Sequence, residues 1–136
     1  MKIAIRYYTK SKKGNTRKLA DAVSQALGVE ALDVSAGLEE KADRLFLINA
    51  MYAADVDREI KTFLEENRAM IGEVVNMNTA ATGASTRKAV KRVTEPLGIP
   101  LCEQEFHCVG SWVFLNRGLP SEADLARAKD FAKSLA

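Results

Sequence analysis

Short apolar segments alternate with segments of helical periodicity along the whole chain, and this alternation constrains the fold more than any other feature of the sequence. The run at 45–48, Leu-Phe-Leu-Ile, is continuously apolar, which is typical of a parallel strand covered on both faces. We expect strands at 3–8, 29–34, 45–48, 74–77 and 101–109, the last continuing over 112–115 after a break at Gly110.

Four helices are expected between and after these strands, because apolar residues recur there at intervals of three and four. Gly28 and Gly98 stand where the first and third helices would end. Asp55 is the expected N-cap of the second helix, Pro120 and Ser121 open the last, and a further helical turn is expected at 38–41. The apolar positions of the four helices are Leu19, Val23, Ala26 and Leu27; Val56, Ile60, Phe63 and Leu64; Ala89, Val90, Val93 and Leu97; and Leu125, Ala128, Ala132 and Leu135.

This order of elements predicts one α/β domain over residues 1–136, a doubly wound, five-stranded parallel sheet with helices on both faces. Right-handed crossovers leave few topologies, and the strand order 2-1-3-4-5 is the leading one. Ligands of such sheets bind beyond the carboxyl ends of the strands, at the switch point between strands one and three. The segments expected to form a site are therefore 9–16, 49–55, 78–85 and 110–119.

Composition and charge argue against nucleic acid and membranes as partners and against secretion. The formal net charge is +2 with both signs scattered along the chain, which favours neither nucleic acid nor a membrane surface. No apolar run approaches the ~18 residues of a membrane span. The sequence begins with a strand rather than a signal peptide, so we expect a cytoplasmic protein. The spacing of Cys102 and Cys108 matches no common metal or redox motif, and both are expected to be buried thiols.

The loop after the first strand carries the strongest chemical signal. Residues 11–16, Ser-Lys-Lys-Gly-Asn-Thr, end at a helix N-terminus, where unpaired backbone N–H groups and the helix dipole favour a phosphate. Ser11 and Thr16 can donate hydroxyl hydrogen bonds, and Gly14 can bring the backbone close or adopt a positive φ. The basic residues around this loop are Lys10, Lys12, Lys13, Arg17 and Lys18.

This loop resembles the Ser/Thr-x-Thr-Gly-x-Thr phosphate loop of flavodoxins, and it differs only at Lys13, where the family usually has threonine. Residues 114–120, Phe-Leu-Asn-Arg-Gly-Leu-Pro, are similar to the segment before the last helix of short-chain members. The resemblance implies the flavodoxin fold and an FMN cofactor whose phosphate is held by residues 11–16.

Two further loops agree with the resemblance. In flavodoxins the loop after the third strand often carries an aromatic residue that stacks on the flavin, and Tyr52 matches it. Many members have glycine next, where this chain has Ala53 and Ala54, and alanine at positive φ costs about 1 kcal/mol or more. The family uses the loop at 78–85 for backbone contacts to the flavin. The implied cofactor-binding residues are Thr9, Ser11, Lys12, Lys13, Gly14, Asn15, Thr16, Met51, Tyr52, Ala53, Asn78, Thr79, Ala80 and Gly83, with no catalytic residue and no metal ligand.

Other chemistries of this architecture lack their residues. A receiver domain needs an aspartate at the end of the third strand, where this chain has Asn49. A low-molecular-weight phosphatase needs a cysteine after the first strand, and none lies there. Neither the P-loop pattern nor Gly-x-Gly-x-x-Gly is present. His107 is the only histidine and is expected to be structural, so a Ser-His-Asp system or a zinc site is disfavoured.

Three functions stay open. The first is an FMN-binding electron-transfer protein, an electron carrier rather than a stand-alone enzyme. The second is a small FMN-dependent reductase of the quinone type, although such enzymes usually need more chain. The third is a flavin-free binding domain. For the first, we expect redox proteins as partners, without nucleic acid or membrane, and a monomer or weak homodimer, with Trp112 in the core or at an oligomer contact.

Overall fold

Five parallel strands form one sheet in the order β2-β1-β3-β4-β5, which confirms the predicted fold class. The structure is a computed structural model that describes residues 1–10, 14–51, 55–110 and 118–136. The strands are β1 (Ile3–Tyr7), β2 (Ala31–Asp33), β3 (Arg44–Ala50), β4 (Val74–Ala80) and β5 (Phe106–Val109), and the helices are α1 (Asn15–Leu27), α2 (Arg58–Asn67), α3 (Arg87–Leu97) and α4 (Glu122–Ser134).

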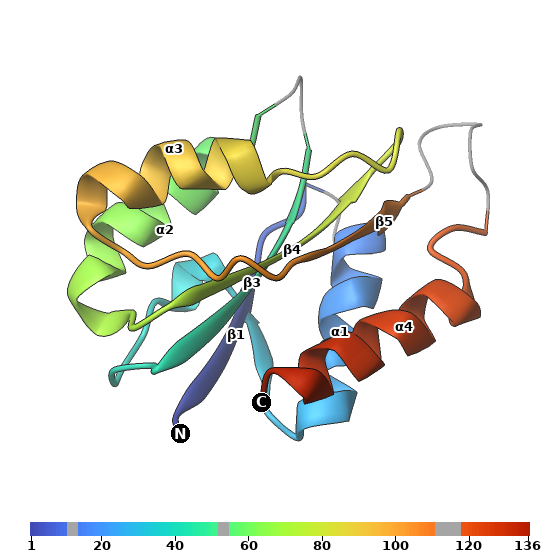
Figure 1. The fold of residues 1–136 in the computed structure, drawn as a ribbon, viewed down its shortest axis with the longest axis horizontal. Coiled ribbons are helices and arrows are strands. Elements are labelled where there is room, and N and C mark those ends of the chain that lie inside the picture. The colour runs from blue at the N-terminus through green and yellow to red at the C-terminus, as the bar shows by residue number, and fades with distance from the viewer. Residues whose placement is uncertain (11–13, 52–54, 111–117) are drawn as a thin grey trace.

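The helices cover both faces of the sheet. Figure 1 shows α1 and α4 side by side on one face and α2 and α3 on the other. This arrangement follows from the right-handed crossovers that join successive parallel strands. Within the described parts of the chain, no helix is both long and apolar enough to cross a membrane.

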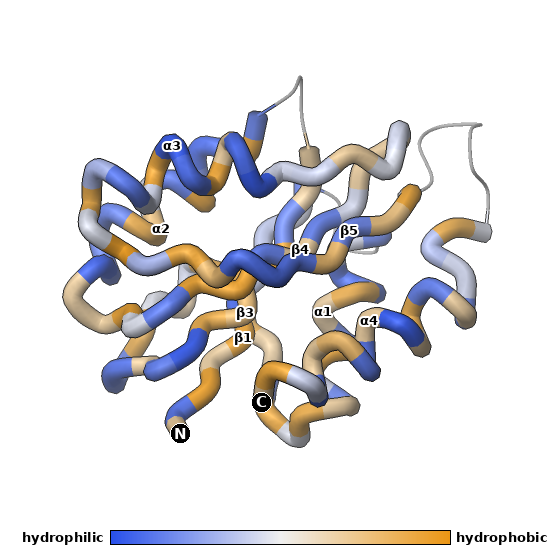
Figure 2. Tube along the Cα trace, viewed as in Figure 1, coloured by the Kyte–Doolittle hydropathy of each residue, from blue (hydrophilic) through white to orange (hydrophobic). Residues whose placement is uncertain are grey.

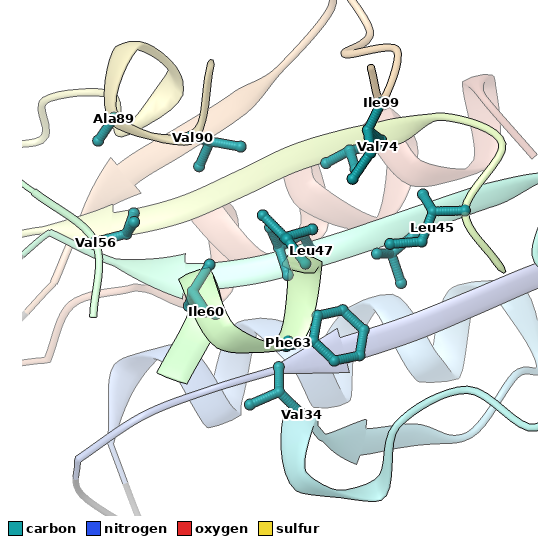
Figure 3. Packing of buried hydrophobic residues seen from close by; sticks show 12 residues of the cluster. Val34, Leu45, Leu47, Val56, Ile60, Phe63, Val74, Ala89, Val90 and Ile99 are labelled. Carbon is teal, nitrogen blue, oxygen red and sulfur yellow. The ribbon is translucent and has the colours of Figure 1, made fainter. Parts of the chain in front are cut away.

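Alternate residues of β3 supply the two halves of the core. Leu45 and Leu47 pack against α2 and α3, as Figure 3 shows, whereas Phe46 and Ile48 pack against α1 and α4. All four side chains are fully buried. Because successive side chains of a strand point to opposite faces, a strand covered on both sides must be apolar throughout. The continuous apolar run at 45–48 is therefore a strand covered on both faces, as the sequence predicted.

Three predicted helix boundaries are confirmed: the ends of α1 and α3 and the start of α4. Gly28 and Gly98 follow α1 and α3 with φ of 65° and 70°, a left-handed conformation that favours glycine. Ser121 caps α4 in a reciprocal box: its side chain accepts from the backbone N–H of Asp124, whose carboxylate accepts from the backbone N–H of Ser121.

The predicted start of α2 is wrong by two residues. Asp57, not Asp55, is the N-cap, and its carboxylate accepts from the backbone N–H of Glu59 at 3.1 Å. Asp55 instead accepts from the N–H of Val56 and from Lys61, and the bond from Lys61 lowers the pKa of Asp55. Both carboxylates can cap a helix, and only the path of the chain after β3 selects one.

The other corrections concern strand lengths. β2 covers only residues 31–33 of the predicted 29–34, and its carboxyl end is set by a 3-10 helix at 34–36 capped by Asp33. No helical turn forms at 38–41, where one was expected. β5 begins only at Phe106, since Leu101 makes a single bridge to Val74 before the chain leaves the sheet. The predicted continuation at 112–115 lies outside the described residues. β3 and β4 run further than predicted, to Ala50 and Ala80.

A buried polar network ties β3 and β4 to the start of α3. Asn49 donates to the side-chain oxygen of Asn76 at 2.7 Å, Asn76 donates to the Thr86 hydroxyl at 3.0 Å, and that hydroxyl donates to the side-chain oxygen of Asn49 at 2.6 Å. These three residues are at most 1% exposed. Each buried amide is therefore satisfied by another member of the network, and the three positions depend on one another.

We expect Asn76→Ala to lower the free energy of unfolding by about 2 to 4 kcal/mol, because it leaves Asn49 and Thr86 with missing partners in the protein interior. Urea unfolding measures this change. Gln104→Ala, which removes an exposed amide, is the control and should change the stability by less than about 0.5 kcal/mol. A loss of similar size in both variants would contradict the role given to the network.

The two cysteines differ in environment. Cys102 is half-buried and Cys108 is buried on β5. Burial, with a smaller contribution from the negative charge of Asp124, raises the pKa of the Cys108 thiol from 9.0 to about 11. The folded protein therefore holds this proton at a pH where the unfolded chain has released it.

This difference predicts a pH dependence of stability. The stability of the protein relative to Cys108→Ala should be greatest below pH 9 and decrease as the pH rises toward about 11, because the unfolded thiol ionises first. Urea unfolding of both proteins across this window measures the effect. A stability difference that stays constant with pH would contradict the assignment of a buried neutral thiol.

Candidate functional site

The loops that follow β1, β3, β4 and β5 all leave the sheet at its carboxyl edge, where parallel α/β sheets bind their ligands (Figure 1). The structure describes a part of each loop. Among the predicted cofactor-binding residues, Ser11, Lys12, Lys13, Tyr52 and Ala53 lie outside the described residues, as does Trp112. The remaining nine predicted residues can be placed.

The N-terminus of α1 lies at this edge. Gly14 is the N-cap, with φ −76° and ψ 174°, so the positive φ considered for this glycine is not adopted. Gly14 has no side chain to cap the helix, and the first turn of α1 contains no acidic residue. The helix dipole therefore faces the edge without a carboxylate of its own first turn opposing an anion there.

Thr16, in the first turn of α1, contacts the end of β4. Its hydroxyl lies 3.2 Å from the hydroxyl of Thr79, and both residues are buried. One hydrogen bond between two hydroxyl groups uses only one of their two hydrogens. The pair thus fixes α1 against β4 and retains one hydroxyl hydrogen for another acceptor.

The end of β5 closes the site beside α1. A Cβ atom at Gly110 would lie 2.9 Å from Nδ2 of Asn15, so the glycine backbone lies directly against that side chain. The Gly110 N–H donates to the carbonyl of Ala80 at 3.0 Å. Any larger residue at position 110 would require the Asn15 side chain to shift.

Backbone groups and small residues form the part of the site next to β3 and β4. The Met51 N–H donates to the carbonyl of Thr79 at 3.1 Å, and Ala80 is buried at the end of β4. Gly83 has φ 78°, and its carbonyl accepts from Nδ1 of His107 at 2.7 Å. Residues as small as Ala80 and Gly83 let a ligand approach the backbone closely.

Asn78, Thr79 and Ala80 all belong to β4, so they precede the loop to which the sequence analysis assigned them. The side chain of Asn78 points to the α3 face of the sheet, opposite that of Thr79. Its side chain donates to the carbonyl of Ala84 at 2.9 Å and accepts from the N–H of Thr86 at 3.1 Å. Asn78 therefore anchors the β4–α3 loop.

The basic residues near the first loop are partly engaged with acidic ones. Lys10 pairs with Asp57 at 3.5 Å, which links the loop after β1 to the N-cap of α2. Arg17 pairs with Asp21 at 3.2 Å and lies 5.2 Å from the ring centre of Tyr7. Thr9, half-buried, follows β1 at the same edge.

Gly110 and His107 were not among the named cofactor-binding residues. Gly110 opens the segment 110–119 that was expected at the site, but its contact with Asn15 joins positions far apart in the sequence. His107, which was expected to be structural, is exposed and donates a hydrogen bond to the carbonyl of Gly83. No local pattern indicates that partner, because β5 and the β4–α3 loop meet only in the folded chain.

Among known proteins, the similar ones are solved structures with the same fold. No family model and no curated protein sequence matches the chain. A flavodoxin from the domain Archaea is similar over 100% of this chain and 96% of its own, with a TM-score of 0.74 and 13% identity. The flavodoxin of Streptococcus pneumonia TIGR4 is similar over 99% and 97%, with a TM-score of 0.64 and 21% identity.

An NAD(P)H:quinone oxidoreductase from Methanothermobacter marburgensis is similar over 99% of this chain and 96% of its own, with a TM-score of 0.70 and 16% identity. At these identities the likeness concerns the fold. The strand order, the helices on both faces and the full-length superpositions agree. The chain therefore has the flavodoxin-like fold.

Proposed function

We propose that this protein binds FMN at the carboxyl edge of its sheet and transfers electrons through it. The observation that carries the proposal is the N-terminus of α1, which opens onto this edge beside Thr79 and Gly110 without a side-chain cap or an acidic residue in its first turn. A helix start without a side-chain cap or an acidic first turn suits the FMN phosphate.

The described residues fit the remainder of FMN as well. The ends of β3 and β4 present backbone groups and small side chains, with Met51, Ala80 and Gly83 closest to the edge. A planar ring can approach such a surface without displacing large side chains. The Asn78 and His107 hydrogen bonds hold the β4–α3 loop in place from two sides.

FMN, when bound, supplies the redox chemistry, while the protein supplies binding, orientation and electrostatics. In this chain, the α1 N-terminus would hold the phosphate, and the Thr16–Thr79 pair would provide one hydroxyl hydrogen bond. The buried ends of β3 and β4 would exclude water from one side of the ring. Electron transfer of this type requires no acid or base from the protein, in agreement with the absence of a predicted catalytic residue.

Asn15→Asp tests where the phosphate binds. The change is isosteric and adds a negative charge in the first turn of α1, so we expect FMN affinity to fall about tenfold or more through repulsion of the phosphate. Riboflavin, which has no phosphate, should bind equally well to both proteins. Titration of each apo protein, followed by quenching of flavin fluorescence, gives the dissociation constants.

Ala123→Asp is the matched control, since it adds the same charge to the exposed first turn of α4. It should leave FMN binding unchanged. The original protein should bind FMN with a sub-micromolar dissociation constant. Absence of quenching at tens of micromolar FMN would reject the proposed function and favour a flavin-free binding domain.

A second candidate, an FMN-dependent quinone-type reductase, is favoured by one observation. The similar oxidoreductase is covered over 96% of its length, so chain length does not argue against an enzyme of this type. The FMN-loaded protein should oxidise NAD(P)H in the presence of a quinone if it is such a reductase. An electron carrier should instead show negligible NAD(P)H oxidation and rapid exchange with a redox protein.

A further inference from the structure

Most ion pairs of the protein lie away from α3. The described residues form seven, of which Lys2–Glu40, Lys10–Asp57, Arg17–Asp21, Arg44–Glu73, Lys61–Asp55 and Arg127–Asp124 involve other elements. The one pair within α3, Lys91–Glu95, has the longest separation, 3.9 Å. Of the four basic residues of α3, only Lys91 is in one of these ion pairs, and that pair is the longest.

The basic residues of α3 form a continuous surface, which we call the basic stripe: Lys88, Lys91 and Arg92. They are three and four residues apart, so they share one face of the helix, and all three are exposed. With Arg87 and the single acid Glu95, α3 carries four basic and one acidic residue, a net charge of +3 against +2 for the whole chain.

The stripe faces outward because the opposite side of α3 belongs to the core. Ala89, Val90 and Thr94 are at most 3% exposed. Figure 2 shows the outer side of α3 as hydrophilic. A shallow groove of about 350 Å³ follows this side, lined by Lys88, Lys91, Arg92, Glu95 and Pro96.

The stripe also lies next to the candidate site. α3 begins at Arg87, directly after the β4–α3 loop that borders the carboxyl edge. Val56 packs in one buried cluster with Ala89 and Val90 of α3, which places this helix beside the loop that follows β3 (Figure 3). In agreement, the positive charge of Arg92 contributes to the lowered pKa of Asp55. A partner seated on the stripe would thus approach the two loops proposed to border the flavin.

We infer that the basic stripe docks a protein partner that presents a row of carboxylates, and that this partner exchanges electrons at the adjacent site; the second part rests on the proposed function. Lys88 to Arg92 spans about 6 Å along the helix axis. Carboxylates at helical spacing on a partner can match this interval, and Arg92 can donate two parallel hydrogen bonds to one carboxylate. Charge complementarity of this kind mainly increases the association rate and selects the partner.

The surroundings favour an acidic protein over a nucleic acid. Glu95 lies on the same helix, four residues after Lys91, and Asp55 lies near α3, so a continuous phosphate backbone would meet negative charges that separate carboxylates on a protein can avoid. None of the residues that line the groove is aromatic, so bases would have no stacking surface there. Among the described large hydrophobic residues only Met1 is exposed, which gives no apolar anchor for a lipid surface.

The docking surface can be tested on the full isotope-labelled chain by NMR, with decaglutamate as the probe and oligothymidylate of equal charge as the competitor. Decaglutamate should shift amide signals mainly within 87–95, and this binding should weaken with salt. The double variant Lys88→Glu and Arg92→Glu should weaken decaglutamate binding about tenfold. Lys129→Glu with Lys133→Glu changes the net charge equally on α4 and should have an effect below about twofold.

Equal losses in the two double variants, or signal changes centred on another element, would overturn the docking surface. Tighter binding of oligothymidylate to residues 87–95 would overturn the choice of an acidic protein in favour of nucleic acid. The amide spectrum of each variant shows directly whether it remains folded.

Electron exchange is tested on the FMN-loaded, reduced protein with two small oxidants of opposite charge. The stripe variant should react more slowly than the original protein with hexacyanoferrate(III) and faster with hexaamminecobalt(III), whereas the α4 variant should resemble the original. Unchanged rates would reject the link between the stripe and electron transfer. If the protein takes up no FMN, the proposed function fails, and the peptide titration still decides whether the stripe is a docking surface.

Discussion

Burial of β3 and β4 on both faces is the constraint on which the rest of the structure depends. Leu45 and Leu47 require helices on one side of the sheet, and Phe46 and Ile48 require helices on the other. Since successive parallel strands must be joined by crossovers, the four helices satisfy both demands at once. The same crossovers bring every loop that follows a strand to one edge, so the core arrangement also creates the candidate site.

The polar residues of β4 show how this core is adapted near that edge. Toward its carboxyl end, the strand replaces apolar side chains by amides and a hydroxyl, in Asn76, Asn78 and Thr79. Asn76 and Asn78 bond to the loop before α3, whereas Thr79 bonds to Thr16 on the opposite face. One strand thus positions elements on both sides of the sheet. Such hydrogen-bonded groups restrict the loops more than apolar packing would, because they satisfy only one geometry.

Charge is distributed unequally over the same framework. The start of α1 is free of acidic residues, and α3 carries four basic residues against one acidic residue, while several other surfaces carry paired charges. The first feature suits an anionic cofactor and the second an acidic partner. Both helices begin at the carboxyl edge, so the two features are brought to the same end of the molecule by the fold.

The sequence by itself determined the class of fold and the place of the loop that is predicted to bind phosphate. Both depend on local patterns: the apolar run at 45–48, the helical periodicities, the glycines at 28 and 98, and the Ser-Lys-Lys-Gly-Asn-Thr segment ahead of α1. It also predicted nine of the described site residues as candidates, although their binding of FMN stays a prediction. It misplaced the cap of α2, since Asp55 and Asp57 have the same chemistry and only the path of the chain distinguishes them.

Only the tertiary structure decided the contacts between distant segments. The Thr16–Thr79 pair, the approach of Gly110 to Asn15, the bond from His107 to Gly83 and the buried amide network each join residues that are far apart along the chain. Asn78, grouped with Thr79 in the sequence, lies on the opposite face because side chains alternate along a strand. Local patterns specify which elements form, whereas the packing of those elements specifies which side chains meet.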